Sequence, residues 1–156
     1  MPQVRDRRLS RGLGRAKDSL VLADGSEWIW NLAAERWPGA RELLDFYHGS
    51  GHLWELGRAV CREPKTKPWV EQRLHGLRHG KEQAMLKGIA RLKRPRGQAG
   101  QTVQKEQNYF AGQAGRMNYQ EIADRSWPIG SGAVESAYRQ SHLLSSSSIL
   151  QCRRTI

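Results

Sequence analysis

SLVLADGSEWIWNLAAERWPGARELLDFYHGSGHLWELGRAVC, residues 19–61, is the segment that decides the fold. Its first apolar run, 19–23, is short enough for a buried strand, and the apolar positions of 27–37 recur at helical spacing. A second strand is expected over 41–47 and a second helix over 52–61, because a turn-like His-Gly-Ser-Gly separates them. This alternation predicts an α/β unit whose functional carboxylates lie at the carboxyl ends of its strands.

The middle of the chain has no strand signal and is expected to be a helical insertion over 63–125. A charged helix is predicted over 69–92, with a break near Gly80, and shorter helices are predicted over 102–111 and 118–124. The chain as a whole should therefore be mostly helical.

The chain is strongly basic, with 26 Lys and Arg against 15 Asp and Glu, a net charge of +11 and a sequence pI of about 10.4. This excess predicts a phosphate backbone as partner, although a merely soluble or ribosome-like basic protein has the same composition. Nearby tryptophans (Trp54, Trp69 and Trp127) could belong to the core or to a base-stacking surface, and the core is expected for most of them. Six basic residues that flank the helical insertion are the candidate nucleic-acid contacts: Lys65, Lys67, Arg91, Lys93, Arg94 and Arg96.

Cysteine usage and hydropathy indicate a cytoplasmic protein without a membrane segment. Cys61 and Cys152 lie far apart with no C-x-x-C spacing, which is typical of a reducing compartment. No run approaches the roughly 18 apolar residues of a membrane span. The arginine-rich start also lacks the apolar centre of a secretory signal.

Asp24 follows the first expected strand and has two interpretations. With Glu27 three residues on, it fits the D-x-x-E pattern in which a side chain caps a helix. As a strand-end carboxylate it could instead bind a divalent ion, and Gly25 would leave room for a phosphate to approach. The local sequence leaves both open.

Two further groups of residues are candidate ligands. Asp45, His48 and His52 form D-x-x-H-x-x-x-H, in which imidazole and carboxylate suit zinc or manganese, but a third strong ligand is lacking nearby. Glu135 follows the glycine-rich loop 130–132, where it would meet the positive end of a helix dipole or be presented to a metal ion.

Taken in order, these signals resemble the insertion-sequence DDE transposases of the Mutator-like group. The match covers about residues 19–140, from LADGSEWIW to RMNYQ and WPIGSGAVESAYRQ. Asp24 with its glycine corresponds to the second catalytic aspartate, Asp45 to His48 corresponds to the D-x-x-H element, and Glu135 corresponds to the final glutamate.

The resemblance implies a partial RNase H-like catalytic domain with an all-helical insertion. In such a domain Asp24 and Glu135 would bind Mg²⁺ or Mn²⁺ for in-line phosphoryl transfer, with Asp45 and His48 in supporting roles. It further implies DNA, as transposon ends, for a partner, a nucleoid-associated location and a possible homo-oligomer. The implied organisation is a basic flexible arm (1–18), a partial RNase H-like core (19–62), a helical insertion (63–125), a loop with the glutamate-bearing helix (126–140) and an irregular tail (141–156).

The chain departs from this family at both ends of the match. The first catalytic aspartate should precede the Asp24 strand, yet Asp6 and Asp18 lie in a basic context without strand signal. After the glutamate helix, the family's basic helix gives way to four serines, Ser145–Ser148. We therefore expect a reading frame truncated at its N-terminus, with a frameshift as one explanation of the tail, and a product inactive alone.

Two other functions remain open on the sequence. In the first, the chain is a non-enzymatic basic nucleic-acid-binding or interaction protein whose carboxylates are helix caps. In the second, a single-metal hydrolase is built on Asp24, Asp45, His48 and His52.

Overall fold

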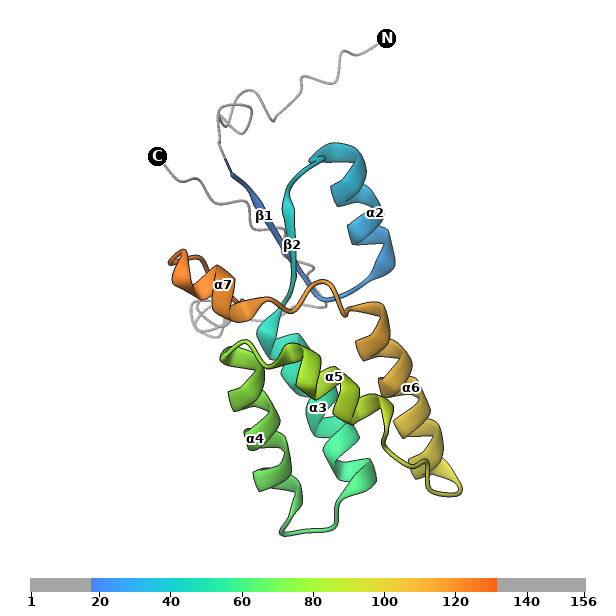
Figure 1. Cartoon of the computed structure of the whole chain (residues 1–156). Coiled ribbons are helices and arrows are strands. Elements are labelled where there is room, and N and C mark those ends of the chain that lie inside the picture. The colour runs from blue at the N-terminus through green and yellow to red at the C-terminus, as the bar shows by residue number, and fades with distance from the viewer. Residues whose placement is uncertain (1–17, 132–156) are drawn as a thin grey trace, which may run out of the picture.

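The computed structural model describes residues 18–131, which form a two-stranded parallel sheet and six helices (Figure 1). This is a mostly helical α/β arrangement, as expected. The helix expected from Ala133 onward, including Glu135, lies outside the described residues. The elements are β1 (Leu20–Ala23), α2 (Glu27–Arg36), β2 (Arg41–Leu44), α3 (Phe46–Val60), α4 (Thr66–Arg78), α5 (Glu82–Ala90), α6 (Gln98–Gly112) and α7 (Tyr119–Asp124).

The sheet consists of β1 and β2, which are joined by α2 as a crossover helix. Leu20 pairs with Arg41, and the register continues to Ala23 opposite Leu44. All four β1 side chains are buried, which is typical of a parallel strand covered on both faces. One face packs on α2 through a small cluster (Val21, Ala23, Ile29, Trp30 and Ala33), and the other face joins the main core.

Helix α3 begins earlier than the sequence predicts. The strand expected over 41–47 ends at Leu44, because Asp45 accepts hydrogen bonds from the backbone of Tyr47 and His48 and so caps a new helix. The His-Gly-Ser-Gly stretch therefore lies inside a helix rather than in a turn. The break near Gly80 is confirmed, since α4 ends at Arg78 and Gly80 has a φ of +68°.

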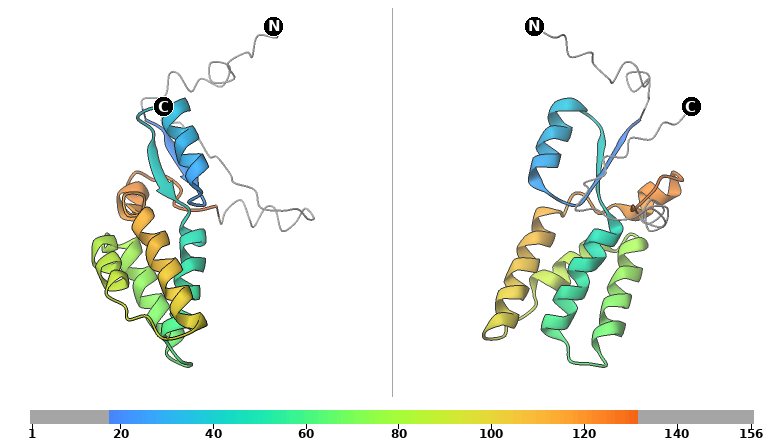
Figure 2. Two further views of the ribbon diagram at one scale, coloured as in Figure 1. Left: turned by 90° about the vertical axis from the view of Figure 1, so that its right-hand side faces the viewer. Right: turned by 180° about the vertical axis from the view of Figure 1, so that it is seen from behind.

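The helices α3 to α6 pack together below the sheet, and α3 lies between α4 and α6 (Figures 1 and 2). Of the three tryptophans considered for the core, Trp127 is buried in it, and Trp54 and Trp69 are partly buried against it. Their shared core consists of fully buried side chains from all four helices, among them Leu53, Leu56, Val70, Leu77, Ile89, Val103 and Phe110.

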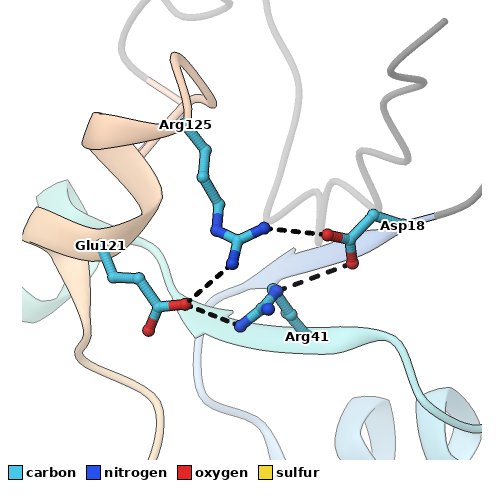
Figure 3. Close-up of polar contacts among 4 residues, drawn as sticks. All are labelled: Asp18, Arg41, Glu121 and Arg125. Atoms are coloured by element: carbon cyan, nitrogen blue, oxygen red, sulfur yellow. Dashed lines mark hydrogen bonds and ion pairs between the residues drawn. The ribbon is translucent and has the colours of Figure 1, made fainter.

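An ion-pair network fastens α7 to the amino end of the sheet (Figure 3). Arg41 contacts Glu121 at 2.8 Å and Asp18 at 3.6 Å, and Arg125 contacts the same two carboxylates at 3.4 and 3.0 Å. Isolated exposed pairs contribute little, but here each charge has two partners. The network joins three segments that are far apart in the sequence.

Gly57 permits the close approach of α3 and α4. A Cβ at this position would lie 2.6 Å from Val70 Cγ2, whereas a Cβ at Gly51 of the same helix would meet nothing within 4 Å. We predict that Gly57→Ala lowers the free energy of unfolding by about 1–3 kcal/mol through overpacking. Gly51→Ala, the matched control, should raise it by about 0.5–1 kcal/mol. Urea denaturation measures both, and equal effects would show that the helices do not approach at Gly57.

Candidate functional site

Asp24 and Asp45 lie next to each other at the carboxyl edge of the sheet. The register places Ala23 opposite Leu44, so the residue after each strand is an aspartate. The Asp45 amide also donates to the Ala23 carbonyl at 2.7 Å, which continues the pairing one residue beyond β2. This is the edge at which the sequence predicts functional carboxylates.

Asp45 uses both carboxylate oxygens to bind backbone amides. Oδ1 accepts from Tyr47 at 2.9 Å and from His48 at 3.1 Å, and Oδ2 accepts from Ser131 at 2.7 Å. The side chain is buried, with 7% of the residue exposed. Asp45 therefore caps α3 and ties the glycine-rich loop to the carboxyl edge.

Asp24 is not the N-cap of α2, so the structure does not support the capping interpretation of D-x-x-E for this residue. The N-cap is Ser26, whose side chain makes no capping hydrogen bond, while Asp24 Oδ1 accepts from the Ser26 amide at 3.0 Å. The physical reason is Gly25, whose φ of +94° turns the chain before the helix begins. The bond from Ser26 closes an Asx turn, which holds the Asp24 carboxylate against its own backbone.

Helix α6 holds the Asp24–Gly25 turn from the opposite side. Tyr109 Oη donates to the Asp24 carbonyl at 3.2 Å, and Gln113 Nε2 donates to the Gly25 carbonyl at 2.9 Å. Burial, and then the Asp24 charge, raise the pKa of Tyr109, so its phenol remains a donor at neutral pH. Sequence reasoning missed both contacts, because each joins residues more than 80 positions apart.

Two histidines of α3 face α6 beside this turn. His48 and His52 share one helix face, as their spacing suggests, with ring centroids 5.1 Å apart. His52 stacks on Tyr109, with centroids 3.6 Å apart and ring planes inclined by 13°. Its Nδ1 lies 2.6 Å from Oε2 of Glu106, a fully buried carboxylate that the sequence did not indicate.

The charges of this cluster follow from its contacts. Burial alone would raise the pKa of Glu106, but the hydrogen bond and charge of His52, helped by Lys105, lower it overall. Glu106 is therefore ionised and can only accept, so His52 Nδ1 is protonated and donates the hydrogen bond to Glu106 Oε2. Partial burial and then His52 lower the pKa of His48, and this outweighs the opposite effect of Asp24 and Asp45. His48 is thus a neutral imidazole at pH 7.

The described residues do not form a metal site by themselves. Across residues 18–131, no three His, Cys, Asp or Glu side chains are grouped to hold an ion. The cluster of the alternative single-metal hydrolase, Asp24, Asp45, His48 and His52, is therefore not formed there. The physical reason is that Glu106 binds His52 Nδ1 and backbone amides occupy both Asp45 oxygens. Asp24 offers the oxygen ligand that Mg²⁺ prefers, and Glu135, the expected second ligand, lies outside the described residues.

The candidate nucleic-acid contacts lie at the other end of the helical part. Lys65 and Lys67 belong to the start of α4, and four further basic residues (Arg91, Lys93, Arg94 and Arg96) belong to the α5–α6 connection; all six are exposed. Figures 1 and 2 show both segments at the end of the helices away from the sheet. Residues 61–105 contain twelve Lys and Arg against three Asp and Glu. The 15-residue α3 separates this basic end from the carboxyl edge, roughly 22 Å at the usual helical rise.

Comparison of the chain with protein-family models, with curated proteins and with solved structures finds no match. In the part of the chain that the structure describes, no helix is long and apolar enough to cross a membrane. The function is therefore inferred from the geometry at the carboxyl edge and from the basic end.

Gly25→Ala tests the contact between α6 and the turn. The new Cβ would lie 2.9 Å from Tyr109 Oη and 3.1 Å from Leu44 Cδ1, in addition to the cost of positive φ. Gly39 has a similar φ of +88° but nothing within 4 Å, so Gly39→Ala is the matched control. We predict a loss of about 1–2 kcal/mol for Gly39→Ala and about 1–3 kcal/mol more for Gly25→Ala. Equal losses in thermal or urea denaturation would contradict this contact.

Glu106→Gln tests the buried pair with His52. Because the folded-state pKa of Glu106 is lowered from its ordinary value of 4.5, its ionised form stabilises the fold above that pH and loses this effect on further acidification. The variant should lose about 1.5–3 kcal/mol at pH 7 and show a flatter decline of stability below pH 4.5. Glu55→Gln, in an exposed pair with Arg58, should change neither quantity. An unchanged acid decline in Glu106→Gln would exclude the pair.

Proposed function

We propose that this chain is a DDE-type transposase chain of the Mutator-like group, related to DNA cleavage and strand transfer and inactive by itself. One observation carries the proposal: the parallel register brings Asp24 and Asp45 together at the carboxyl edge of the sheet. The two residues come from the segments that resemble the aspartate-glycine and D-x-x-H elements of that group. The mostly helical part that follows agrees with its helical insertion.

The partial RNase H-like fold belongs to the same proposal. A parallel strand pair joined by a crossover helix is compatible with one part of such a sheet. Asp24, together with Glu135, would bind Mg²⁺ or Mn²⁺, while Asp45 and His48 would organise the edge around them. The contacts of Asp45 favour that supporting role, because its oxygens hold α3 and the glycine-rich loop in place.

We propose that the chain alone is inactive because too few carboxylates lie at the carboxyl edge of the sheet. Asp18 lies before β1, at the opposite end of the strand from Asp24, and is paired with Arg41 and Arg125. It therefore cannot supply the first catalytic aspartate beside Asp24 at the carboxyl edge. Within residues 18–131 no third carboxylate is grouped with Asp24 and Asp45. A two-metal site short of one carboxylate would hold its ions poorly, and the ions supply much of the transition-state stabilisation.

DNA is the proposed partner because the lysines and arginines of residues 18–131 are concentrated in the helical part. Six exposed basic residues around the α3–α4 and α5–α6 connections provide sites for phosphates at its far end. Such contacts are independent of base sequence, so transposon ends would need further recognition elsewhere.

A second candidate is a non-enzymatic basic nucleic-acid-binding or interaction protein. The observation that favours it is that Asp45 is a helix cap and Asp24 closes a turn, so each carboxylate has a structural role without any metal ion. In this case the basic end alone would carry the function.

Manganese binding separates the two candidates. We predict that the full chain binds Mn²⁺, which electron paramagnetic resonance of the free ion measures. Asp24→Asn or Glu135→Gln should weaken this binding roughly 10-fold or more, because each substitution removes an oxygen ligand. Asp124→Asn, at the exposed end of α7, should bind Mn²⁺ like the unsubstituted chain. Equal binding by all the variants would support the second candidate, and metal-dependent plasmid nicking by the chain alone would contradict the proposed inactivity.

A further inference from the structure

Two large aromatic side chains are exposed in the described part of the chain. Trp28 is 58% exposed and Tyr47 is 51% exposed, and no other large hydrophobic residue within 18–131 is exposed to a similar extent. The remaining tryptophans there are buried or partly buried. An exposed ring does not gain the free energy that burial of its apolar surface would give. Folding stability therefore does not explain why these two positions are aromatic.

Both aromatic residues lie in helical turns that start at the carboxyl edge of the sheet. Trp28 lies in the first turn of α2, four residues after Asp24, and Tyr47 lies in the first turn of α3, two residues after Asp45. Figure 1 shows α2 and α3 starting at the same end of the two strands. Because the register places Asp24 beside Asp45, the aromatic residues lie on the two helices that leave this carboxylate pair.

The Tyr47 ring is held in place although half of the residue is exposed. It packs so closely on Gly130 that a Cβ there would lie 2.7 Å from Tyr47 Cδ2. Its edge-to-face contact with Phe46 has a centroid distance of 5.9 Å and an interplanar angle of 87°. Phe46 in turn lies under the guanidinium of Arg78, at 4.8 Å. A ring fixed before binding loses little conformational entropy on contact with a ligand.

The surroundings of the rings fit a nucleic acid better than an apolar protein surface. Asn31 lies one turn after Trp28, and Gly51 lies one turn after Tyr47; both are exposed, as is His48. The rings thus do not belong to a continuous apolar patch of the kind that protein partners bury. A single strand of DNA offers flat bases to isolated rings. Its phosphates can be bound by the exposed lysines and arginines of the basic end, at the other end of α3.

We propose that Trp28 and Tyr47 stack on unpaired bases of a DNA strand that passes the carboxyl edge, while the basic end binds phosphates. The proposal deepens, and rests on, the DNA partner proposed above. It assigns a separate role to each end of α3: sequence-independent phosphate contact at the basic end and base contact at the edge. Discrimination between unpaired and paired DNA should therefore depend on the two rings.

Anisotropy of fluorescein-labelled DNA tests this inference with the full chain. The probes are a 12-nucleotide oligothymidine and a 12-base-pair duplex, both without added metal ion. Trp28→Ala and Tyr47→Ala should each weaken oligothymidine binding roughly 5- to 100-fold, with duplex binding changed less than twofold. Trp28→Phe and Tyr47→Phe should restore most of the affinity, because they keep an aromatic face. Asn31→Ala, an exposed change on α2, should bind both probes like the unsubstituted chain.

The other outcomes overturn the inference in distinguishable ways. Unchanged oligothymidine binding in both alanine variants would exclude stacking and leave the DNA partner intact. Equal weakening of both probes would assign the rings to general binding rather than to unpaired bases. Loss of self-association, seen by sedimentation, with unchanged DNA binding would make them a contact between copies of the chain. Failure of the unsubstituted chain to bind either probe would refute the proposed DNA partner as well.

Discussion

The hydrogen bonds from Tyr109 and Gln113 to the Asp24–Gly25 turn are the constraint on which the carboxyl edge depends. Two parallel strands of four residues have little stability of their own. They are held on one face by α2, and their carboxyl edge is held by α6, which comes some 75 residues later in the chain. Gly25 makes this possible, because a side chain there would collide with Tyr109. The helical part, through α6, thus helps to hold the carboxyl edge in place.

The same helix places a buried charge behind the turn. Glu106 binds His52, His52 stacks on Tyr109, and Tyr109 binds the Asp24 backbone, so the three side chains form one connected unit. Removing the hydrogen-bond partner of the buried Glu106 charge would leave that charge uncompensated, so the pair favours one alignment of α3 and α6. At the opposite end of these helices, the exposed lysines and arginines have few such constraints. The rigid carboxyl edge suits a site whose side chains must keep a fixed geometry. The solvated basic end suits contact with phosphates.

Local patterns were sufficient to predict most of the elements. The apolar run of β1, the helical spacing of α2 and the glycine at position 80 each act within a few residues, so the sequence shows them directly. The start of α3 was missed because Asp45 looks like a strand-end carboxylate, and its capping role appears only when the helix exists. Glu106, Tyr109 and Gln113 were missed for another reason. Their partners are 54 to 88 positions away, and no periodicity links them.

Nuclear Overhauser measurements on the isotopically labelled full chain test most directly whether α6 fixes the Asp24–Gly25 turn beside Asp45. The predicted result is a set of contacts between the Tyr109 ring protons and the Gly25 α-protons, together with interstrand contacts in the register that pairs Ala23 with Leu44. A His52 ring shifted upfield by the stacked Tyr109 should accompany them. Chemical shifts that report the same helices, with the Tyr109–Gly25 contacts missing or the strand pairing displaced by one residue, would contradict this arrangement.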